Sequence, residues 1–395
     1  MKLIGILAFI VALLFSVMVH EFGHYMAARK FGMKVTEFFL GFGKRIWSTQ
    51  RGETEFGIKA IPAGGYCKIA GMTVRDEMEL GEENRAFVKA NSGRKLIVLG
   101  AGSFLHFVLG FLVLLVLYIG VGTDQITQKV SEVSPCIPIA NEVCTSTSIP
   151  SPAQAAGIKA GDYILAINNH PIKNWSDDVQ LIRNSAGKEL TLSIYRDGEK
   201  ITLKATPVKR IVNREARGIL GIVNKVANKR SDPVQATKDS VSLSQEFLVS
   251  SVKSLIALPA KIPALWGQTF QHKERDANGL VGIVGVAAVS GQVTASDQMS
   301  WSERIGAFLL IVASLNFFVG IFNLLPILPL DGGHMAVAIA DEIRAFFARL
   351  RRKPRPAPID VNVLTPITMV VFVLLAALTL MLLVADIINP VNLNL

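Results

Sequence analysis

The sequence predicts a polytopic α-helical membrane protein with four transmembrane helices, a membrane-associated β-hairpin region and a separate α+β domain. Half of the 395 residues are hydrophobic, and the mean hydropathy is positive. Four apolar stretches are long enough to cross the hydrocarbon core of a bilayer. They are Leu3–Val19 and onward, Leu96–Val121, Ile305–Leu330 and Val363–Ala385. The remaining length is sufficient for a folded domain outside the membrane.

The basic residues predict how the chain is oriented. Residues 25–95 contain thirteen Lys and Arg, and residues 344–355 contain six. Cytoplasmic segments carry such an excess, so both should be cytoplasmic. The N-terminus has only Lys2, and no Lys or Arg follows Asp386, which places both termini and residues 122–302 outside the inner (plasma) membrane. The net charge of +10 then reflects basic flanks of membrane spans, so we expect contact with the lipid bilayer and no nucleic-acid partner.

These patterns divide the chain into seven parts. They are a first transmembrane helix (1–33), a cytoplasmic hairpin region (34–93), a second helix (94–122), an extracytoplasmic α+β domain (123–225), an extracytoplasmic helical region (226–302), a third transmembrane segment (303–347), and a connector with the fourth helix (348–395).

The first apolar stretch runs into the motif His-Glu-Phe-Gly-His at residues 20–24. His20 and His24 are four residues apart, so they share one helical face and can bind one metal ion. Glu21 lies beside them, where it can act on a water molecule at the metal. A signal peptide that ends in histidines is the alternative, but it would need a stronger basic start than Lys2 and a small-residue cleavage site. The motif therefore predicts a zinc site.

Asp331 is the expected third zinc ligand. Pro326 and Pro329 should unwind the end of the third span, and the two glycines after Asp331 allow close backbone packing. A carboxylate in a membrane segment is costly unless it is paired or binds metal. The first and third spans run in the same direction, so His20 and Asp331 should meet near the cytoplasmic face. Two imidazoles and one carboxylate leave a position for water, as in catalytic zinc sites. Alternatively, Asp331 only caps a following helix at 335–347.

These motifs together resemble the site-2 protease family of intramembrane zinc metalloproteases. Besides the histidine motif, residues 323–332 read Asn-Leu-Leu-Pro-Ile-Leu-Pro-Leu-Asp-Gly, and residues 41–43 and 57–68 are similar to the membrane-dipping β-hairpin of that family. The resemblance implies a zinc-dependent endopeptidase that cuts transmembrane segments of single-span proteins in regulated intramembrane proteolysis. A typical substrate would be an anti-sigma factor already shortened by another protease, and its cleavage would release a cytoplasmic signalling fragment.

The resemblance also implies roles for individual residues. Glu21 would take a proton from water and return it to the leaving amine. Asn323 would donate a hydrogen bond to the oxyanion or to an extended substrate backbone, although a membrane asparagine can also simply stabilise helix contacts. Apart from the resemblance, His106 is expected to be hydrogen-bonded within the helix bundle without a role in the reaction. His334 could support a metal ligand, but a structural or exposed histidine is the favoured interpretation.

Residues 56–69 alternate loosely between apolar and polar, with Pro62 and Gly64-Gly65 as breaks, which predicts a short β-hairpin. Its edge could pair with an unwound substrate by strand addition. A hairpin that only seals the cytoplasmic face is the alternative.

Residues 151–205 contain a short helix, a Gly-Asp turn, a strand and a hairpin turn at Asp197-Gly198. This order resembles one copy of a bacterial-type PDZ domain, which would begin near the strand at residues 129–133 and act in gating, substrate sensing or scaffolding. Cys136 and Cys144 lie in an apparent insertion, where they form a disulfide or remain free, and cytoplasmic Cys67 should stay a thiol.

Residues 241–270 carry apolar side chains at helical spacing, which predicts an amphipathic helix against the outer leaflet, interrupted by Pro259 and Pro263. Residues 279–288 are apolar but too short for a span and should lead into the site. Two other functional classes stay open. A metal transporter or sensor would use the same ligands without needing Glu21, and a noncatalytic scaffold would act through the PDZ-like domain.

Overall fold

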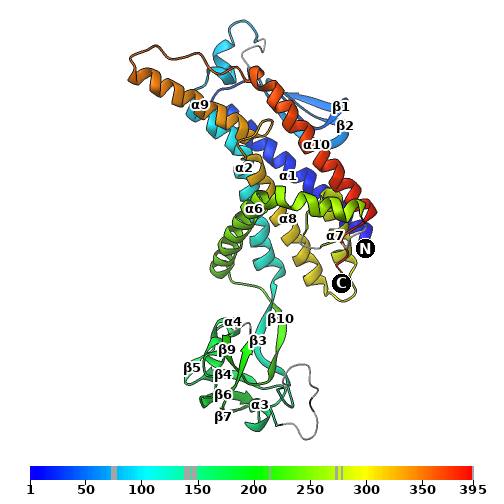
Figure 1. Cartoon of the computed structure of the whole chain (residues 1–395), viewed down its shortest axis with the longest axis vertical. Helices are drawn as coiled ribbons and strands as arrows, with labels where there is room; N and C mark the ends of the chain where they lie inside the picture. The colour runs from blue at the N-terminus through cyan, green and yellow to red at the C-terminus, as the bar shows by residue number, and fades with distance from the viewer. Residues whose placement is uncertain are drawn as a thin grey trace. The chain divides into compact units, whose positions relative to one another are not determined.

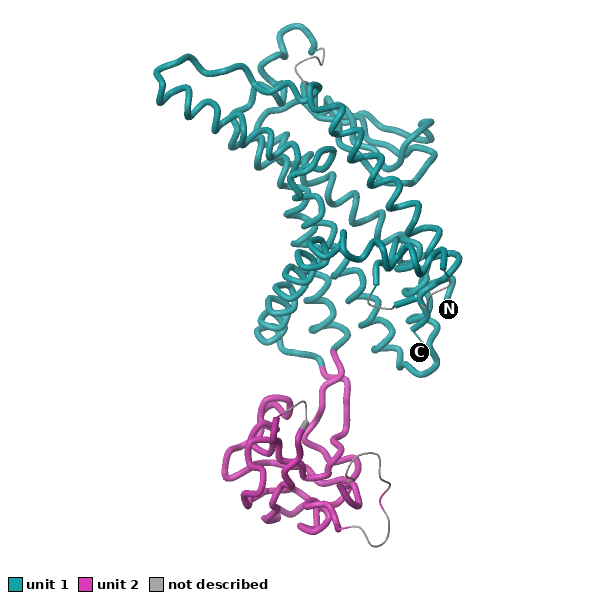
Figure 2. The backbone as a smooth tube through the Cα atoms, viewed as in Figure 1, with its two compact units in different colours: residues 1–122, 230–395 teal, residues 123–229 magenta. Residues whose placement is uncertain are grey.

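The computed structural model describes residues 1–72, 78–137, 144, 149–212, 215–271, 275–276 and 279–393. The chain forms two compact units (Figure 2). Unit 1 joins Met1–Gly122 to Arg230–Leu395, and unit 2 is Thr123–Lys229. Each unit is described by itself below.

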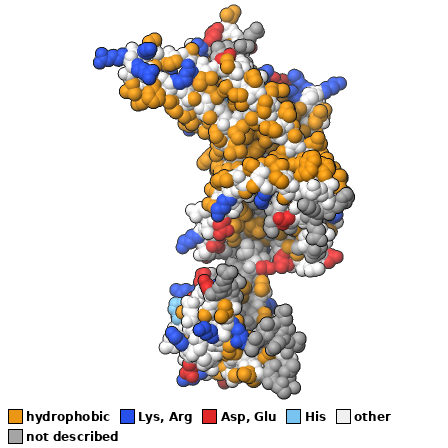
Figure 3. All heavy atoms as spheres, in the orientation of Figure 1, with side chains coloured by type: hydrophobic (Ala, Val, Ile, Leu, Met, Phe, Trp, Pro, Cys, Tyr) orange, Lys and Arg blue, Asp and Glu red, His pale blue; other side chains and the backbone are white. Residues whose placement is uncertain are grey.

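Unit 1 is built from long apolar helices (Figure 1). Within the described residues, five helical segments are long and apolar enough to cross a membrane. They are α1 (Lys2–Lys30), α2 (Ser92–Leu115) with a π-helical turn to Val121, α6 (Pro233–Phe270), α8 (Trp301–Asn323), and α10 (Thr365–Ile388) with a preceding 3-10 turn. Hydrophobic side chains cover the visible surface of this unit over its helices (Figure 3). An apolar exterior of this kind fits a membrane protein, because lipid replaces water around it.

Helix α6 is the candidate span that the sequence did not predict. Asp232 caps its start by accepting from the backbone N–H groups of Val234 and Gln235. The expected interruption is wrong, because Pro259 and Pro263 both lie inside one 38-residue helix. Each proline removes one N–H donor, but the hydrogen bonds of the flanking turns persist and the helix continues. The helix changes direction along its length (Figure 1).

The short helix α7 (Ile283–Ala295) packs against the first turns of α1. A Cβ atom added at Gly5 would lie 2.8 Å from the carbonyl oxygen of Ser290, and one at Gly291 would lie 2.9 Å from that of Lys2. The expectation that this segment leads into the site is therefore wrong. Gly5 precedes His20 by fifteen residues, which is about 22 Å along a helix.

A buried ion pair lies at the end of unit 1 where α7 packs against the start of α1. Arg275 donates from Nη2 to Oδ1 of Asp386 over 2.9 Å, and the Gly285 amide donates to the other carboxylate oxygen over 2.8 Å. Both side chains are almost fully buried. Since Gln292 of α7 also donates to the carbonyl of Val391, the ends of α7 and α10 are held together. Both chain termini lie at this end of the unit (Figure 1).

The predicted hairpin at residues 56–69 is wrong in its pairing. Strands β1 (Val35–Arg51) and β2 (Thr54–Ile69) are long, and Phe38 of β1 pairs with both Phe56 and Cys67 of β2. The two arms of β2 therefore flank β1, and the four segments lie in the order 45–51, 54–59, 35–42 and 61–69. The close approach of these segments uses Gly41, whose φ is +86° and whose added Cβ would lie 2.7 Å from the carbonyl oxygen of Ile61. Residues 65–69 form one edge of this sheet.

Cys67 in that edge segment is a free thiol, as expected. Burial, helped by the nearby charge of Glu21, raises the pKa of the Cys67 thiol to about 12. It therefore stays protonated at neutral pH and is a poor nucleophile.

Unit 2 is an α+β fold whose helices and strands share one hydrophobic core. Its main sheet has the order β10-β3-β4-β6-β7, with β5 beside β4, and β8 and β9 form a separate hairpin. The strands are β3 (Thr123–Val133), β4 (Tyr163–Ile167), β5 (His170–Pro171), β6 (Leu190–Arg196), β7 (Glu199–Ala205), β8 (Val208–Val212), β9 (Glu215–Ile219) and β10 (Ile222–Lys229), and the helices are α3 (Pro152–Ala155), α4 (Trp175–Asp178) and α5 (Gln180–Arg183). The predicted helix, Gly-Asp turn, strand and later hairpin are all present. Asp197 and Gly198 both have left-handed φ, as a tight hairpin turn requires.

A buried ion pair also stabilises this unit. Arg196 of β6 donates to both carboxylate oxygens of Asp162 over 2.7 Å, and the Lys159 amide donates to the same carboxylate. Burial raises the pKa of Asp162, but these hydrogen bonds and the charge of Arg196 outweigh it and hold that pKa below its usual value.

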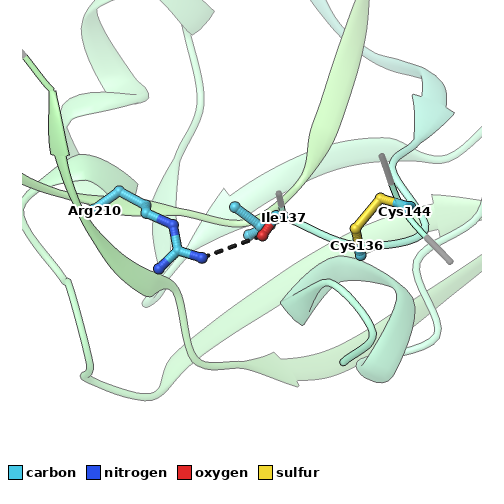
Figure 4. The surroundings of a disulfide bond; sticks show 4 residues. All are labelled: Cys136, Ile137, Cys144 and Arg210. Atoms are coloured by element: carbon cyan, nitrogen blue, oxygen red, sulfur yellow. Dashed lines mark hydrogen bonds between the residues drawn. A yellow bond between two sulfur atoms is a disulfide. The ribbon is translucent and has the colours of Figure 1, made fainter. Parts of the chain in front are cut away.

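Cys136 and Cys144 form a disulfide (Figure 4). Beside it, Arg210 of β8 donates to the carbonyl oxygen of Ile137 over 3.2 Å, which ties this loop to the β8–β9 hairpin. Of the predicted insertion between the two cysteines, residues 138–143 lie outside the described part of the chain.

Candidate metal centre

Three side chains from two distant parts of the sequence meet inside unit 1. His20 and His24 come from successive turns of α1. Asp331 is the first residue of α9 (Asp331–Leu350), which follows the turn 324–330 after α8. These are the three residues expected to hold zinc, and among the described residues they form the one group of His, Cys, Asp or Glu close enough to share a metal ion.

The three donor atoms form a nearly equilateral triangle. Nε2 of His24 lies 3.1 Å from Nε2 of His20, and Oδ2 of Asp331 lies 3.2 Å from the first histidine and 3.3 Å from the second. Zinc bonds of about 2.0 Å in a tetrahedron place any two ligand atoms about 3.3 Å apart. The triangle therefore matches one face of a zinc tetrahedron.

The chemistry of the donors also fits zinc. Nδ1 of His24 lies 2.8 Å from the carbonyl oxygen of Val98, so it carries the proton and leaves Nε2 free to bind metal. The side chains of His20 and His24 are each 9% exposed, whereas that of Asp331 is 23% exposed. The cluster is thus closed on the histidine side and open beside the carboxylate, where a water or substrate group could enter.

Two glycines let α1 and α2 approach closely at the centre. A Cβ atom added at Gly23 would lie 2.5 Å from the carbonyl oxygen of Ala101. One added at Gly102 would lie 2.6 Å from both Nε2 of His24 and Cε1 of His20. Since real Cβ atoms do not come so close, any side chain at these positions would separate the helices or displace the imidazoles.

The chain before Asp331 is packed just as tightly. A Cβ atom added at Gly332 would lie 2.3 Å from the carbonyl oxygens of Leu324 and Leu325, and one at Gly333 would lie 2.4 Å from the Leu328 amide. Leu330 occupies the N-cap position, and Asp331 follows it as the first residue of α9. Its position in the first turn still suits a carboxylate, but the carboxylate is directed at the histidines, which opposes the alternative of a simple helix cap.

Glu21 lies beside the edge segment of the β1–β2 sheet. Its carboxylate is within hydrogen-bonding reach of the Cys67 amide, and its Cγ lies 3.4 Å from the position that a Cβ of Gly65 would take. The strand edge 65–69 is therefore adjacent to the residue expected to move protons.

Other residues singled out in the sequence lie around the centre. Asn323 is the last residue of α8 and is partly buried. His334 lines a small cavity with Lys95 and Val361 and is not one of the three metal donors. His106 is hydrogen-bonded to Asn316 of α8, as expected for a bundle histidine. Sequence reasoning missed Asn316, although an amide in the middle of an apolar helix is costly unless it is paired and could have indicated such a partner.

Apolar helices that carry two histidines, an aspartate and an adjacent glutamate in this geometry define a membrane metallopeptidase centre. The model of Peptidase family M50 matches residues 8–375. The chain is 33% identical over 411 residues to the zinc metalloprotease Rip1 of Mycobacterium tuberculosis, covering 98% of each protein. It is 29% identical to metalloprotease MmpA of Caulobacter vibrioides, covering 85% of this chain and 87% of that protein. For the regulator of sigma E protease of Salmonella typhi, identity is 26%, with coverage of 85% and 90%. The chain therefore belongs to peptidase family M50, the site-2 protease family of zinc metalloproteases, and zinc is its cofactor.

Proposed function

We propose that this protease cuts peptide bonds within the transmembrane segments of single-span proteins, with His20, His24 and Asp331 as the zinc ligands. The observation that carries the proposal is the triangle of donor atoms, whose sides of 3.1, 3.2 and 3.3 Å fit zinc, inside an apolar helical unit. Glu21 follows His20 directly and lies next to the sheet edge, so proton transfer and substrate docking would occur in one place.

In this mechanism the chain's own residues position the substrate and move the proton. Zinc, when bound, would supply a Lewis acid that polarises water and the scissile carbonyl. Glu21 accepts a proton from the attacking water and returns it to the leaving amine. Asn323 donates a hydrogen bond to the oxyanion or to the substrate backbone. A helical segment must unwind first, because its carbonyls are engaged in its own hydrogen bonds.

The edge segment 65–69 supports docking of the unwound substrate by strand addition. Its partner on one side is the first half of β1, and its other side is the edge of the sheet. A substrate strand added there would run past Glu21, since Gly65 and Cys67 both lie beside that residue. A sheet that only seals the cytoplasmic face would not require this proximity.

We further propose a multi-pass protein of the inner membrane, with both termini outside and the active site near the cytoplasmic face. Lys and Arg side chains gather beside α9 and the β1–β2 sheet (Figure 3). Exposed apolar side chains of α9 lie next to this basic region and suit the membrane interface. They are Ile339, Ile343, Phe346, Phe347 and Leu350. In this arrangement α1, α2, α8 and α10 are the four spans, and the bent α6 lies along the outer leaflet.

For unit 2 we propose an extracytoplasmic PDZ domain that gates or senses substrates. The support is its order of elements, with α3 followed by a Gly-Asp turn, β4 and the β6–β7 hairpin. The regulator of sigma E protease is a relative by sequence. By analogy with its name, we propose that the substrate is a membrane-bound anti-sigma factor, cut in the second step of regulated intramembrane proteolysis.

The test compares Glu21→Gln with the wild-type chain for zinc content and for cleavage of a membrane-embedded reporter in vesicles. We expect full zinc occupancy and at least a ~100-fold loss of cleavage, because the general base is removed while the ligands remain. Glu132→Gln, at an exposed position in β3, is the matched control and should cleave normally. Full cleavage by Glu21→Gln would refute the protease mechanism. Retained zinc without cleavage would exclude a transporter, sensor or scaffold that has no need of Glu21.

A further inference from the structure

The two metal-binding imidazoles have unequal surroundings. Nδ1 of His24 has an acceptor, the carbonyl oxygen of Val98 at 2.8 Å. Nδ1 of His20 is buried and has no hydrogen-bond partner among the residues that the structure describes. A histidine that binds metal through Nε2 carries a proton on Nδ1, and this N–H normally donates to an outer acceptor that fixes the ring. One of the two zinc ligands therefore lacks a partner that the chemistry requires.

Helix α2 supplies the candidate for that missing partner. Val98, Gly102 and His106 are spaced four residues apart, so they share one face of α2. Val98 faces His24, and Gly102 faces both imidazoles, with its added Cβ only 2.7 Å from Nδ1 of His20. One turn further along this face, the His106 ring lies next to the His20 ring, with 5.0 Å between the ring centroids. His106 is 2% exposed, so water does not compete freely for it.

Asn316 determines which nitrogen of His106 carries the proton. Its Nδ2 donates to the carbonyl oxygen of Val312 over 2.8 Å and to Oγ of Ser16 over 3.1 Å. Because a carbonyl only accepts, this orientation directs Oδ1 of Asn316 toward Nδ1 of His106, at 2.8 Å. Nδ1 of His106 must then be the donor, and in the neutral ring Nε2 is an acceptor.

The separation of the two rings allows a direct bond. An imidazole nitrogen lies about 1.1 Å from its ring centre, so at a centroid distance of 5.0 Å two nitrogens that point along the line between the centres can approach to about 2.8 Å, a normal hydrogen-bond distance. The rings are tilted by 40° and Nδ1 of His20 is not hydrogen-bonded within the described residues, so the bond requires rotation of at least one ring.

We propose that His106 is the outer hydrogen-bond partner of His20, with its Nε2 accepting the Nδ1 proton of His20 when zinc is bound. The inference rests on the proposed zinc centre and assigns a positioning residue to it. Asn316 orients His106 from α8, and Ser16 anchors Asn316 one turn before His20 on α1. Three helices thus converge on one metal ligand. For His24, the backbone carbonyl oxygen of Val98 is the corresponding outer hydrogen-bond acceptor.

The test measures zinc affinity by chelator competition on the full-length protein in micelles, without substrate. His106→Leu removes the acceptor, and we expect its affinity for Zn²⁺ to fall about 10-fold to 100-fold. In His106→Gln the amide oxygen reaches a similar position, so most of that affinity should return. His170→Leu changes an exposed histidine of unit 2 and should bind zinc like the wild type. Thermal unfolding of each zinc-free variant is recorded in parallel.

Unchanged zinc affinity in His106→Leu would overturn the inference. So would a loss that His106→Gln does not restore and that accompanies an equal loss of zinc-free stability, because that result describes packing alone. These outcomes are separable from failure of the proposed function. A wild-type protein that binds zinc but leaves the reporter uncut would refute intramembrane proteolysis and leave the role of His106 intact.

Discussion

Unit 1 contains two carboxylates in apolar surroundings, Asp386 and Asp331, and their negative charges face different kinds of partner. Asp386 is fully buried and faces the guanidinium of Arg275 together with the Gly285 amide. Asp331 is 23% exposed and faces the Nε2 atoms of two histidines. A carboxylate in an apolar region needs a compensating positive charge. The fold supplies that charge for Asp386 from an arginine, whereas Asp331 faces two imidazoles that can themselves bind a metal ion.

This difference indicates what each residue is for. The charge of Asp386 is neutralised within the chain, so its pair can form as the protein folds and can serve a structural purpose. The charge of Asp331 would be compensated by a bound metal cation, because the two histidines beside it are typical zinc ligands. The comparison predicts that removing each carboxylate will damage a different property of the protein.

The largest effect is expected for Asp331→Asn. Loss of the anionic donor should reduce zinc affinity by at least ~100-fold and abolish reporter cleavage, because two neutral imidazoles bind zinc weakly. The zinc-free protein should unfold within about 1 kcal/mol of the wild type, since Asp331 has no lysine or arginine partner among the described residues. Metal analysis and unfolding in micelles measure the two quantities. Normal zinc content in this variant would remove Asp331 from the ligand set.

Asp386→Asn should show the reverse pattern. Breaking this pair leaves the Arg275 charge buried and uncompensated, which should destabilise the protein by about 3 to 5 kcal/mol. The fraction that remains folded should still bind one zinc ion. The double variant Asp386→Leu with Arg275→Met serves as the control and should recover most of the stability, because both buried charges are removed. A stable single variant would show that this pair contributes little to the fold.

The smallest effect concerns Asp162 of unit 2, which is buried like Asp386. Its pKa is lowered in the folded state, so its contribution is fully present above about pH 4 and is lost as pH falls through the lower folded pKa. Asp162→Asn should cost about 2 kcal/mol at neutral pH. Hydrogen exchange of β4 and β6 in the full chain measures this difference, which should shrink as the pH falls below about 4. A constant difference at these lower pH values would mean that Asp162 does not titrate as proposed.

The sequence predicted the elements whose signals are local. The four apolar stretches correspond to α1, α2, α8 and α10, and the Asp197-Gly198 turn lies where its residue types placed it. Pairing over longer distances was not predictable in the same way. The broken pattern at Pro62 indicated a chain reversal, but it could not reveal that β1 lies between the two arms of β2. The prolines of α6 were also misleading, because proline weakens a helix without necessarily ending it.

For the site, the helical spacing of His20 and His24 and the unfavourable free energy of a membrane carboxylate at Asp331 were enough to identify three residues that the fold brings together. The sequence did not indicate which distant residues pair with each other around the site and elsewhere in unit 1. His106 and Asn316 are 210 residues apart, and Arg275 and Asp386 are 111 apart. No local pattern specifies such pairs, because they depend on which faces of the packed helices meet.

The close approach of Gly102 to both imidazoles has a consequence for variation within the centre. A methyl group at that position would occupy the place where the two rings now converge, 2.6 Å from each. An otherwise complete set of metal donors could thus be disabled by a net addition of one carbon and two hydrogens, at a residue that contributes no donor atom of its own. A chain could keep every histidine, aspartate and glutamate of the motif and still be inactive. To infer activity from the motif, one must therefore also check that residue 102 is glycine.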